Sequence, residues 1–126
     1  MGKLTFKKEE RLNKEKWIRE LFEKGSSFHL SPFRVIYLPH PDPLYPVHQV
    51  LISVSARNFK KAVDRNTIKR RIREAYRLSK AKILSPGKWL IAYIYTAKEI
   101  LPSEAIHKRL VLTFDRLQWK EHDKKN

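Results

Sequence analysis

The sequence predicts a small α/β (α+β) two-layer sandwich, in which helices pack on a mixed sheet. Runs rich in β-branched and aromatic residues, typical of strands, alternate with longer segments whose apolar residues recur every three or four positions, as in helices. A length of 126 residues suits one domain, and a hydrophobic content of 41% with three Trp is enough for a core. The predicted order is α-β-β-α-β-α, within a single domain over residues 1–126.

The first half of the chain supplies one helix and two strands. Asn13 is a suitable N-cap for a helix over residues 14–24, and Gly25 is a natural stop for it. Strands are predicted over residues 33–38 (FRVIYL) and 49–55 (QVLISVS). Four prolines lie between them, so residues 39–48 are predicted to form a loop.

The second half supplies a basic helix over about residues 62–80, a turn at 85–87 and a strand over 88–96. That strand is apolar on both faces and is therefore expected to be central. Pro102-Ser103-Glu104 opens a last helix, expected over about 103–119. We expect an ordered core over about residues 5–118 and a frayed polar tail at 120–126. The core residues expected on the last helix are Ile106, Leu110, Leu112, Phe114 and Leu117.

The basic helix and the residues before it hold most of the charge. Eleven Lys and Arg against two acidic residues give residues 57–82 a net charge of +9, out of +15 for the chain. At about 100° per residue, one arc of this helix is apolar and carries Ile68, Ile72, Ala75, Tyr76 and Ser79. The adjoining arc carries Asn66, Lys69, Arg70, Arg73 and Arg77, and Arg65 and Arg71 flank the apolar stripe.

An array of cations fixed on a packed helix matches a polyanion of fixed shape, most commonly nucleic acid. The alternative is an ordinary solvated face, eased by intrahelical pairs such as Arg70–Glu74. Acidic residues are nearly absent from the arc, so repulsion among the cations stays unrelieved unless an anion binds. We therefore favour nucleic-acid binding.

Several classes of protein are not supported by the sequence. The chain has no Cys, which excludes disulfides, Cys-based zinc sites and thiol catalysis and is compatible with a reducing cytoplasm. No run approaches 18 apolar residues, so we expect no membrane span. The five His lack metal-ligand spacing, and no carboxylate pair stands out as an acid and a base. We expect no catalytic residue and no metal ligand, and interpret Glu9, Glu10 and Glu15 as charges that flank a helix.

Residues 61–75, KAVDRNTIKRRIREA, resemble the signature of the bacterial ribonuclease P protein component. That family carries Ala-Val, any residue, Arg-Asn-Arg, Ile-Lys-Arg, two further residues and Arg. The chain departs from it at Thr67, where the family has the second Arg of Arg-Asn-Arg, and at Lys60, where many members have Gly. The resemblance covers about residues 5–118. The matching residues are Ala62-Val63, Arg65-Asn66, Ile68-Lys69-Arg70 and Arg73.

The resemblance implies an α/β sandwich with a left-handed βαβ crossover at the basic helix, against the general rule. It also implies a cytoplasmic bacterial protein that binds a catalytic RNA, with which it removes the 5′ leader of precursor tRNA. The expected partners are ribonuclease P RNA and the leader, with no DNA and no membrane, and the protein is expected to be monomeric. The RNA would carry the Mg²⁺-dependent chemistry, so no cofactor is expected on protein side chains.

The resemblance also implies two sets of binding residues. The motif residues Arg65, Asn66, Lys69, Arg70 and Arg73 are expected to face the catalytic RNA, together with Arg57, Lys60 and Lys61 before the helix. A cleft between the first helix and the sheet is expected to hold the leader, with aromatic side chains stacking on bases. Its expected residues are Trp17, Ile18 and Phe22, with Ile36 or Tyr37 from the first strand.

Other interpretations remain open at this point. Phe22 and Tyr37 would equally suit a core without any role in binding. A structural RNA-binding protein of the ribosomal type has the same size, charge and basic helix, and it would bind RNA without stimulating cleavage. A helix-turn-helix DNA-binding protein is disfavoured, because the basic helix follows a strand and not a paired helix.

Overall fold

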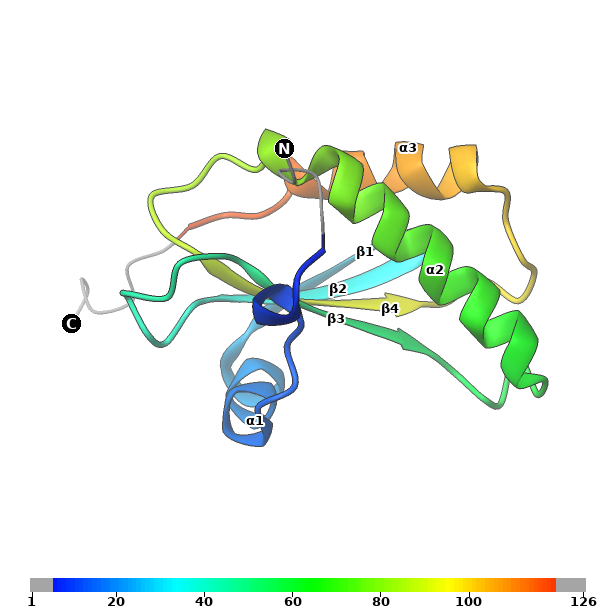
Figure 1. The fold of residues 1–126 in the computed structure, drawn as a ribbon, viewed down its shortest axis with the longest axis horizontal. Helices are drawn as coiled ribbons and strands as arrows, with labels where there is room; N and C mark the ends of the chain where they lie inside the picture. Colours follow the sequence, from blue (N-terminus) through cyan, green and yellow to red (C-terminus); the bar gives the residue numbers. More distant parts are fainter. Residues whose placement is uncertain (1–5, 120–126) are drawn as a thin grey trace.

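The computed structural model describes residues 6–119, which form a four-stranded sheet with helices on both faces (Figure 1). The tail at 120–126 that the sequence predicts to be frayed lies outside the described residues. The elements, in chain order, are η1 (Lys8–Glu10), α1 (Glu15–Lys24), β1 (Ser26–Leu30), β2 (Phe33–Pro39), β3 (Gln49–Val54), α2 (Ala62–Ser79), η2 (Lys80–Lys82), β4 (Trp89–Tyr95) and α3 (Ser103–Phe114).

The sheet has the order β1-β2-β4-β3, in which β2 is antiparallel to both β1 and β4, and β3 is parallel to β4. The predicted fold class is therefore confirmed, and β4 is an inner strand as its apolar sequence predicts. One element is additional: β1, SSFHL, lies at an edge and exposes Ser26, Ser27 and His29. Such a strand carries little apolar signal, which is why the sequence does not reveal it.

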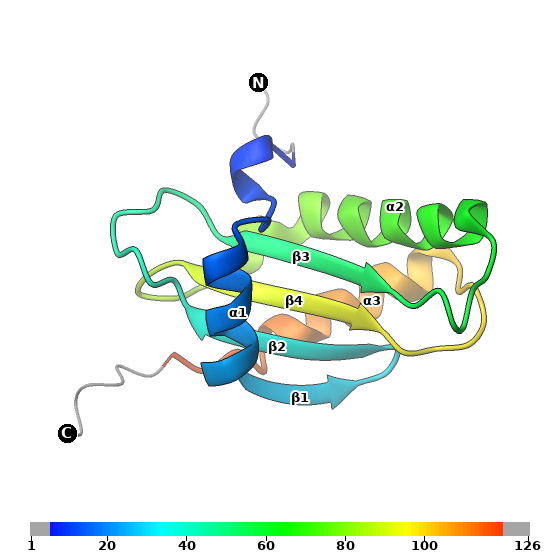
Figure 2. The same cartoon turned by 90° about the horizontal axis from the view of Figure 1, so that it is seen from below.

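Two helices cover one face of the sheet and one helix covers part of the other (Figure 1). Figure 2 shows β3 and β4 running in the same direction, with α2 behind them and α1 crossing in front. The connection β3–α2–β4 passes behind the sheet in a left-handed sense, which is rare for parallel neighbours. The crossover implied by the resemblance is thus present.

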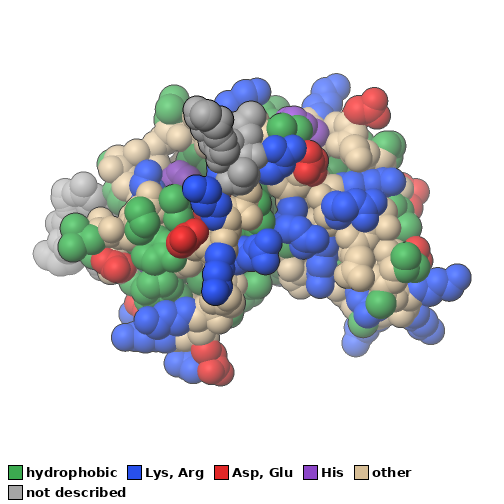
Figure 3. Space-filling view, viewed as in Figure 1, with side chains coloured by type: hydrophobic (Ala, Val, Ile, Leu, Met, Phe, Trp, Pro, Cys, Tyr) green, Lys and Arg blue, Asp and Glu red, His purple; other side chains and the backbone are tan. Residues whose placement is uncertain are grey.

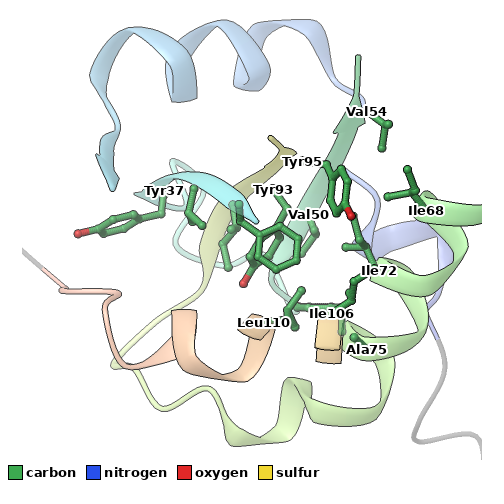
Figure 4. Close-up of a cluster of buried hydrophobic side chains, with 14 of the residues drawn as sticks. Tyr37, Val50, Val54, Ile68, Ile72, Ala75, Tyr93, Tyr95, Ile106 and Leu110 are labelled. Atoms are coloured by element: carbon green, nitrogen blue, oxygen red, sulfur yellow. The ribbon is translucent and has the colours of Figure 1, made fainter. Parts of the chain in front are cut away.

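Each face of the sheet has its own core. On the α2 and α3 side, Ile68 and Ile72 of α2 and Ile106 and Leu110 of α3 are fully buried and point towards the sheet (Figure 4). On the α1 side, a smaller cluster is built around Leu21, together with Leu12, Ile36, Leu90 and Ala92. Successive strand residues serve opposite cores because side chains alternate along a strand.

Helix α1 begins and ends for reasons that differ from those predicted. Its N-cap is Lys14, not Asn13, and no side chain caps it. Gly25 follows the helix with φ −74°, so the glycine is not needed for a left-handed turn. A Cβ at Gly25 would lie 2.5 Å from the Leu21 carbonyl oxygen and 2.9 Å from that of Tyr37. The residue is small because α1 ends directly against β2.

Helix α3 is shorter than predicted and ends at Phe114 instead of residue 119. Ile106 and Leu110 are buried as predicted, but Leu112 is 43% exposed and the prediction that it is a core residue is wrong. Thr113 is buried in its place, where its hydroxyl lies 2.8 Å from the Tyr93 hydroxyl and donates to the Leu110 carbonyl. A polar residue can therefore face the core when both of its hydrogen-bonding needs are met inside it.

Candidate nucleic-acid interface

Helix α2 has one buried face, and that face is the one predicted. Its buried residues are Ile68, Ile72, Ala75, Tyr76 and Ser79, which pack on β3, β4 and α3. Burial raises the pKa of Tyr76 far above its usual value, so the phenol stays neutral. The packed face fixes the rotation of the helix and therefore the direction in which its cations point.

The cations of α2 lie on the side of the helix that faces solvent. Asn66 and Arg70 are exposed, whereas Lys69 and Arg73 are half-buried with their charged ends near the surface. Arg57, Lys60 and Lys61 precede the helix and are exposed. Figure 3 shows Lys and Arg side chains gathered along α2 and continuing towards the N-terminal segment, with few acidic side chains among them.

Two arginines that flank the buried stripe bind backbone carbonyls. Arg65 Nη1 donates to the carbonyls of Phe59 and Lys60 at 2.7 and 3.0 Å, and Arg71 Nη1 donates to the Leu101 carbonyl at 2.7 Å. Arg65 thus holds the loop before α2, and Arg71 ties α2 to the segment before α3. Arg65 combines this structural task with its place in the sequence motif, whereas Arg70 has no hydrogen bond or ion pair to any residue in 6–119.

Two polar residues of α2, Thr67 and Glu74, bind partners within the same helix. The Thr67 hydroxyl donates to the Val63 carbonyl at 2.9 Å, so the residue that replaces the family arginine offers no cation to a ligand. Glu74 binds Arg77 and not Arg70, so the Arg70–Glu74 pair that would ease a solvated face is not formed. The Arg77 guanidinium holds the pKa of Glu74 below its usual value.

A groove of about 370 Å³ runs between α2, the edge strand β3 and the N-terminal segment. Lys69 and Arg73 line one side and Arg11 lines another, over a floor that includes Val50 and Ile52. Arg11 could not be predicted from the sequence, because its position depends on a bridge to β3 that pairs Arg11 with Val50. This groove extends the cationic surface of α2 onto the edge of the sheet.

A second surface lies on the other face of the sheet, beside α1. Leu21 points into the sheet, and Ile18 packs partly on the same cluster. Phe22 is 47% exposed, which is unusual for a large aromatic side chain. It is therefore a surface residue and not part of the core. Ile36 lies beneath α1 and is 7% exposed, so it forms the floor at this point.

The structure separates the remaining residues predicted for this cleft. Tyr37 points to the opposite face and belongs to the core under α2 and α3, so of the two alternatives on β2 only Ile36 faces α1. Trp17 lies about 140° from Phe22 around the helix, given 100° per residue. Its ring packs against His40 and Tyr45 at centroid distances of 4.5 and 5.5 Å. Trp17 therefore faces the proline-rich loop and not the surface beside Phe22.

The proline-rich loop binds the N-terminal segment to the sheet. Tyr45 and Gln49 each donate a hydrogen bond to the Glu9 carbonyl at 3.0 Å, and His40 stacks on Tyr45. Burial lowers the pKa of His40, and burial with nearby cations lowers that of His48 to about 4. His48 Nδ1 accepts the Trp89 N–H at 3.0 Å, which requires the neutral ring.

Neither a metal centre nor a membrane segment is found in the described part of the chain. Within residues 6–119, no three His, Asp or Glu side chains lie close enough to hold a metal ion. No helix in this range is long and apolar enough to cross a bilayer. A cationic helix held by its buried face on a small α/β sandwich, with an exposed aromatic residue beside an open sheet face, is typical of a nucleic-acid-binding protein.

Comparison with known proteins gives this class a family. The family model described as Ribonuclease P matches residues 6–118. The ribonuclease P protein component of Picosynechococcus sp. is 37% identical over 92 residues, which cover 73% of this chain and 77% of the relative. That of Porphyromonas gingivalis strain W83 is 40% identical over 73 residues, covering 58% of this chain and 53% of the relative. The match thus spans about half the length of this last relative.

Solved structures agree on the fold. The RNase P protein from Thermotoga maritima superposes with a TM-score of 0.73 at 24% identity, covering 87% of this chain and 99% of that one. The Staphylococcus aureus RNase P protein gives a TM-score of 0.67 at 28% identity, covering 85% of this chain and 95% of that one. The chain belongs to the ribonuclease P protein family.

Proposed function

We propose that this protein is the protein subunit of ribonuclease P and assists the endonucleolytic removal of the 5′ leader from precursor tRNA. The observation that carries the proposal is the motif Arg65-Asn66, Ile68-Lys69-Arg70 and Arg73, which lies on a helix whose rotation is fixed by a buried face. Membership of the ribonuclease P protein family supports ribonuclease P RNA as the partner of this surface.

The outer face of α2 is the proposed contact with ribonuclease P RNA. Lys69, Arg70 and Arg73 would neutralise phosphates, with Asn66 adding a neutral hydrogen-bonding group. Arg57, Lys60 and Lys61 would continue this contact on the loop before the helix, which Arg65 holds in place. Each neutralised phosphate releases counterions, so binding by this surface should weaken steeply with added salt.

The surface beside α1 is the proposed contact with the 5′ leader. Phe22 offers an exposed ring on which a base can stack, with Ile18 and Ile36 as apolar neighbours. Stacking on an aromatic face does not read base identity. That property suits a leader whose sequence differs between tRNAs. Tyr37 and Trp17 are not part of this proposal, because both face elsewhere.

We assign the bond-breaking chemistry, with its Mg²⁺, to the RNA subunit. The protein would contribute by positioning substrate and by offsetting the repulsion between two polyanions. A protein with this role should matter most at low Mg²⁺, where few metal ions are available to screen the phosphates.

The test is cleavage of a precursor tRNA by a bacterial ribonuclease P RNA at low Mg²⁺, with and without this protein. We expect the protein to restore cleavage at the mature 5′ end. The matched control is a variant in which Lys69, Arg70 and Arg73 are replaced by Gln. These substitutions leave the buried face of α2 unchanged, so the variant should fold but should not restore cleavage. Binding without any gain in cleavage would contradict the proposal and favour a structural RNA-binding protein.

A further inference from the structure

Half of one face of the sheet has no helix on it. Helix α1 crosses the strands at the end where β3 and β4 begin, and the other half of this face lies open (Figure 2). The side chains on the open half can be read from the strand pairing. His29 of β1 pairs with Arg34 of β2, Arg34 pairs with Ile94 of β4, and Ile94 pairs with Ser53 of β3.

These four residues form a row across the sheet, on the same side as α1. Arg34 alternates with the buried Phe33 and Val35, which serve the opposite core, and it shares its face with Ile36. Neighbouring strands lie about 4.8 Å apart, so the row is about 14 Å long. His29, Arg34 and Ser53 are exposed, and Ile94 is half-buried.

Arg34 is the one Lys or Arg in the four strands of the sheet, and none of these strands contains Asp or Glu. Within residues 6–119, the Arg34 side chain makes no hydrogen bond or ion pair. Arg34 lies on the inner strand β2, next to Ile94 of β4. It is therefore not one of the charged residues that protect the edge of a sheet from aggregation. The exposed guanidinium of Arg34 is therefore free to bind an anion from outside the protein.

The position of Arg34 relative to α1 indicates which anion. Along β2, Arg34 is two residues, or about 7 Å, from Ile36 beneath the helix. Trp17 faces the proline-rich loop at the closed end of α1, so the opposite flank, which carries Phe22, faces the open half of the sheet. A strand of RNA that stacks on Phe22 and continues away from α1 would next reach Arg34.

We propose that Arg34 is a binding site for a backbone phosphate of the single-stranded leader, on the uncovered half of the sheet. This inference rests on the proposed function and adds a second anchoring point to it. The planar guanidinium can donate two hydrogen bonds to one phosphate, which ammonium cannot match in geometry. Phe22 would hold a base and Arg34 would hold the backbone, so together they fix the direction of the leader without reading its sequence.

The experiment uses the reconstituted holoenzyme and precursor tRNA with a blocked scissile linkage. Affinity is measured for tRNA with a long leader, for tRNA with the leader shortened stepwise, and for mature tRNA. Arg34→Gln should weaken binding of the long-leader substrate roughly tenfold and leave mature tRNA unchanged, as expected for loss of a charged hydrogen bond. Arg34→Lys should recover part of the loss, because it keeps the charge without the fork.

A matched control removes the same charge from the other side of the molecule. Arg109 is exposed on α3, which packs on the opposite face of the sheet, so Arg109→Gln should not alter the preference for long leaders. The contacted phosphate is found with leaders that carry one neutral methylphosphonate linkage each. At one or two linkages the wild-type protein should lose affinity, whereas Arg34→Gln should lose no more.

The outcomes separate this inference from the proposed function. If wild-type protein gives no preference for precursor over mature tRNA, the leader contact itself is wrong. If the preference is present and Arg34→Gln keeps it, the Arg34 site is wrong and the leader contact stands. Equal losses on precursor and mature tRNA, or no coupling to any linkage, would also overturn the Arg34 site.

Discussion

Glu10 and Lys80, seventy residues apart, form an ion pair that joins the N-terminal segment to the end of α2. Lys80 Nζ donates to both carboxylate oxygens of Glu10 at 2.7 and 2.8 Å, and the Lys7 N–H donates to the same carboxylate at 3.0 Å. Glu10 is 3% exposed, so this charge that flanks α1 is buried and paired. This pair holds η1 against the C-terminal end of α2.

Lys80→Ala should destabilise the protein strongly, because it leaves the buried Glu10 carboxylate with its backbone donor alone. Removing one partner of a buried pair costs about 3–5 kcal/mol, and we expect the lower end since Lys80 keeps some solvent contact. The measurement is the free energy of unfolding by urea. Lys82→Ala, the loss of an exposed cation two residues on, is the control and should change stability little.

Arg70→Ala should affect RNA binding alone, whereas Arg65→Ala should affect both RNA binding and stability. Arg70→Ala should weaken binding to ribonuclease P RNA and lower the salt slope by about 0.7–0.9 per lost phosphate contact, without affecting stability. Arg65→Ala should also reduce the free energy of unfolding, by about 1–3 kcal/mol, since two hydrogen bonds to backbone carbonyls are lost. Salt-dependent binding and urea unfolding of both variants measure this. An unchanged salt slope for Arg70→Ala would mean that Arg70 does not neutralise phosphate.

Phe22→Ala should weaken binding of precursor tRNA more than that of mature tRNA. Loss of one stacked base costs about 1–3 kcal/mol, or roughly tenfold in affinity. The ring is nearly half exposed, so the fold should tolerate the change, which thermal unfolding would verify. Phe22→Trp, which keeps a stacking surface, should retain the preference. Equal losses on both RNAs would return Phe22 to a purely structural role.

The free energy of unfolding should decrease as the pH is lowered from about 6.5 to about 4, because of His48. Its pKa is lowered from 6.5 to about 4, so the unfolded chain binds a proton in this range before the folded protein does. The contribution is complete above pH 6.5 and is lost as the pH falls towards 4, by up to about 3 kcal/mol. Unfolding measured at several pH values should show a flatter profile for His48→Asn, whose side-chain carbonyl can accept the Trp89 N–H. Parallel profiles for the two proteins would contradict this account.

The inner faces of the helices could be predicted well from sequence, and their ends could not. The buried stripe of α2 follows directly from the spacing of Ile68, Ile72 and Tyr76, because periodicity reports burial. The ends of α1 and α3 depend on contacts between elements, as the close approach of Gly25 to Tyr37 illustrates. Thr113 is buried and Leu112, which was predicted to be a core residue, is not, because Tyr93 supplies Thr113 with a hydroxyl partner that no local pattern reveals.

In the candidate site, too, residues on one helix could be predicted from the sequence, whereas residues placed by contacts between elements could not. The motif on α2 is local and was found, whereas Arg11 and Glu10 approach α2 only through the bridge to β3 and the pair with Lys80. On β2 the sequence left Ile36 and Tyr37 as alternatives, since a shift of one residue reverses the face. The strand pairing resolves this choice, and the same pairing brings Arg34 to the face that carries Phe22.

The left-handed connection through α2 determines which face of the sheet the basic helix occupies. With the same strand order, a right-handed connection would carry α2 across the face that α1 crosses, and the apolar stripe of α2 would cover the row containing Arg34. Because the chain winds the other way, the basic helix and the bare strands point away from each other. The two proposed contacts, with ribonuclease P RNA and with the leader, would therefore lie on opposite faces of the sheet and could be occupied together.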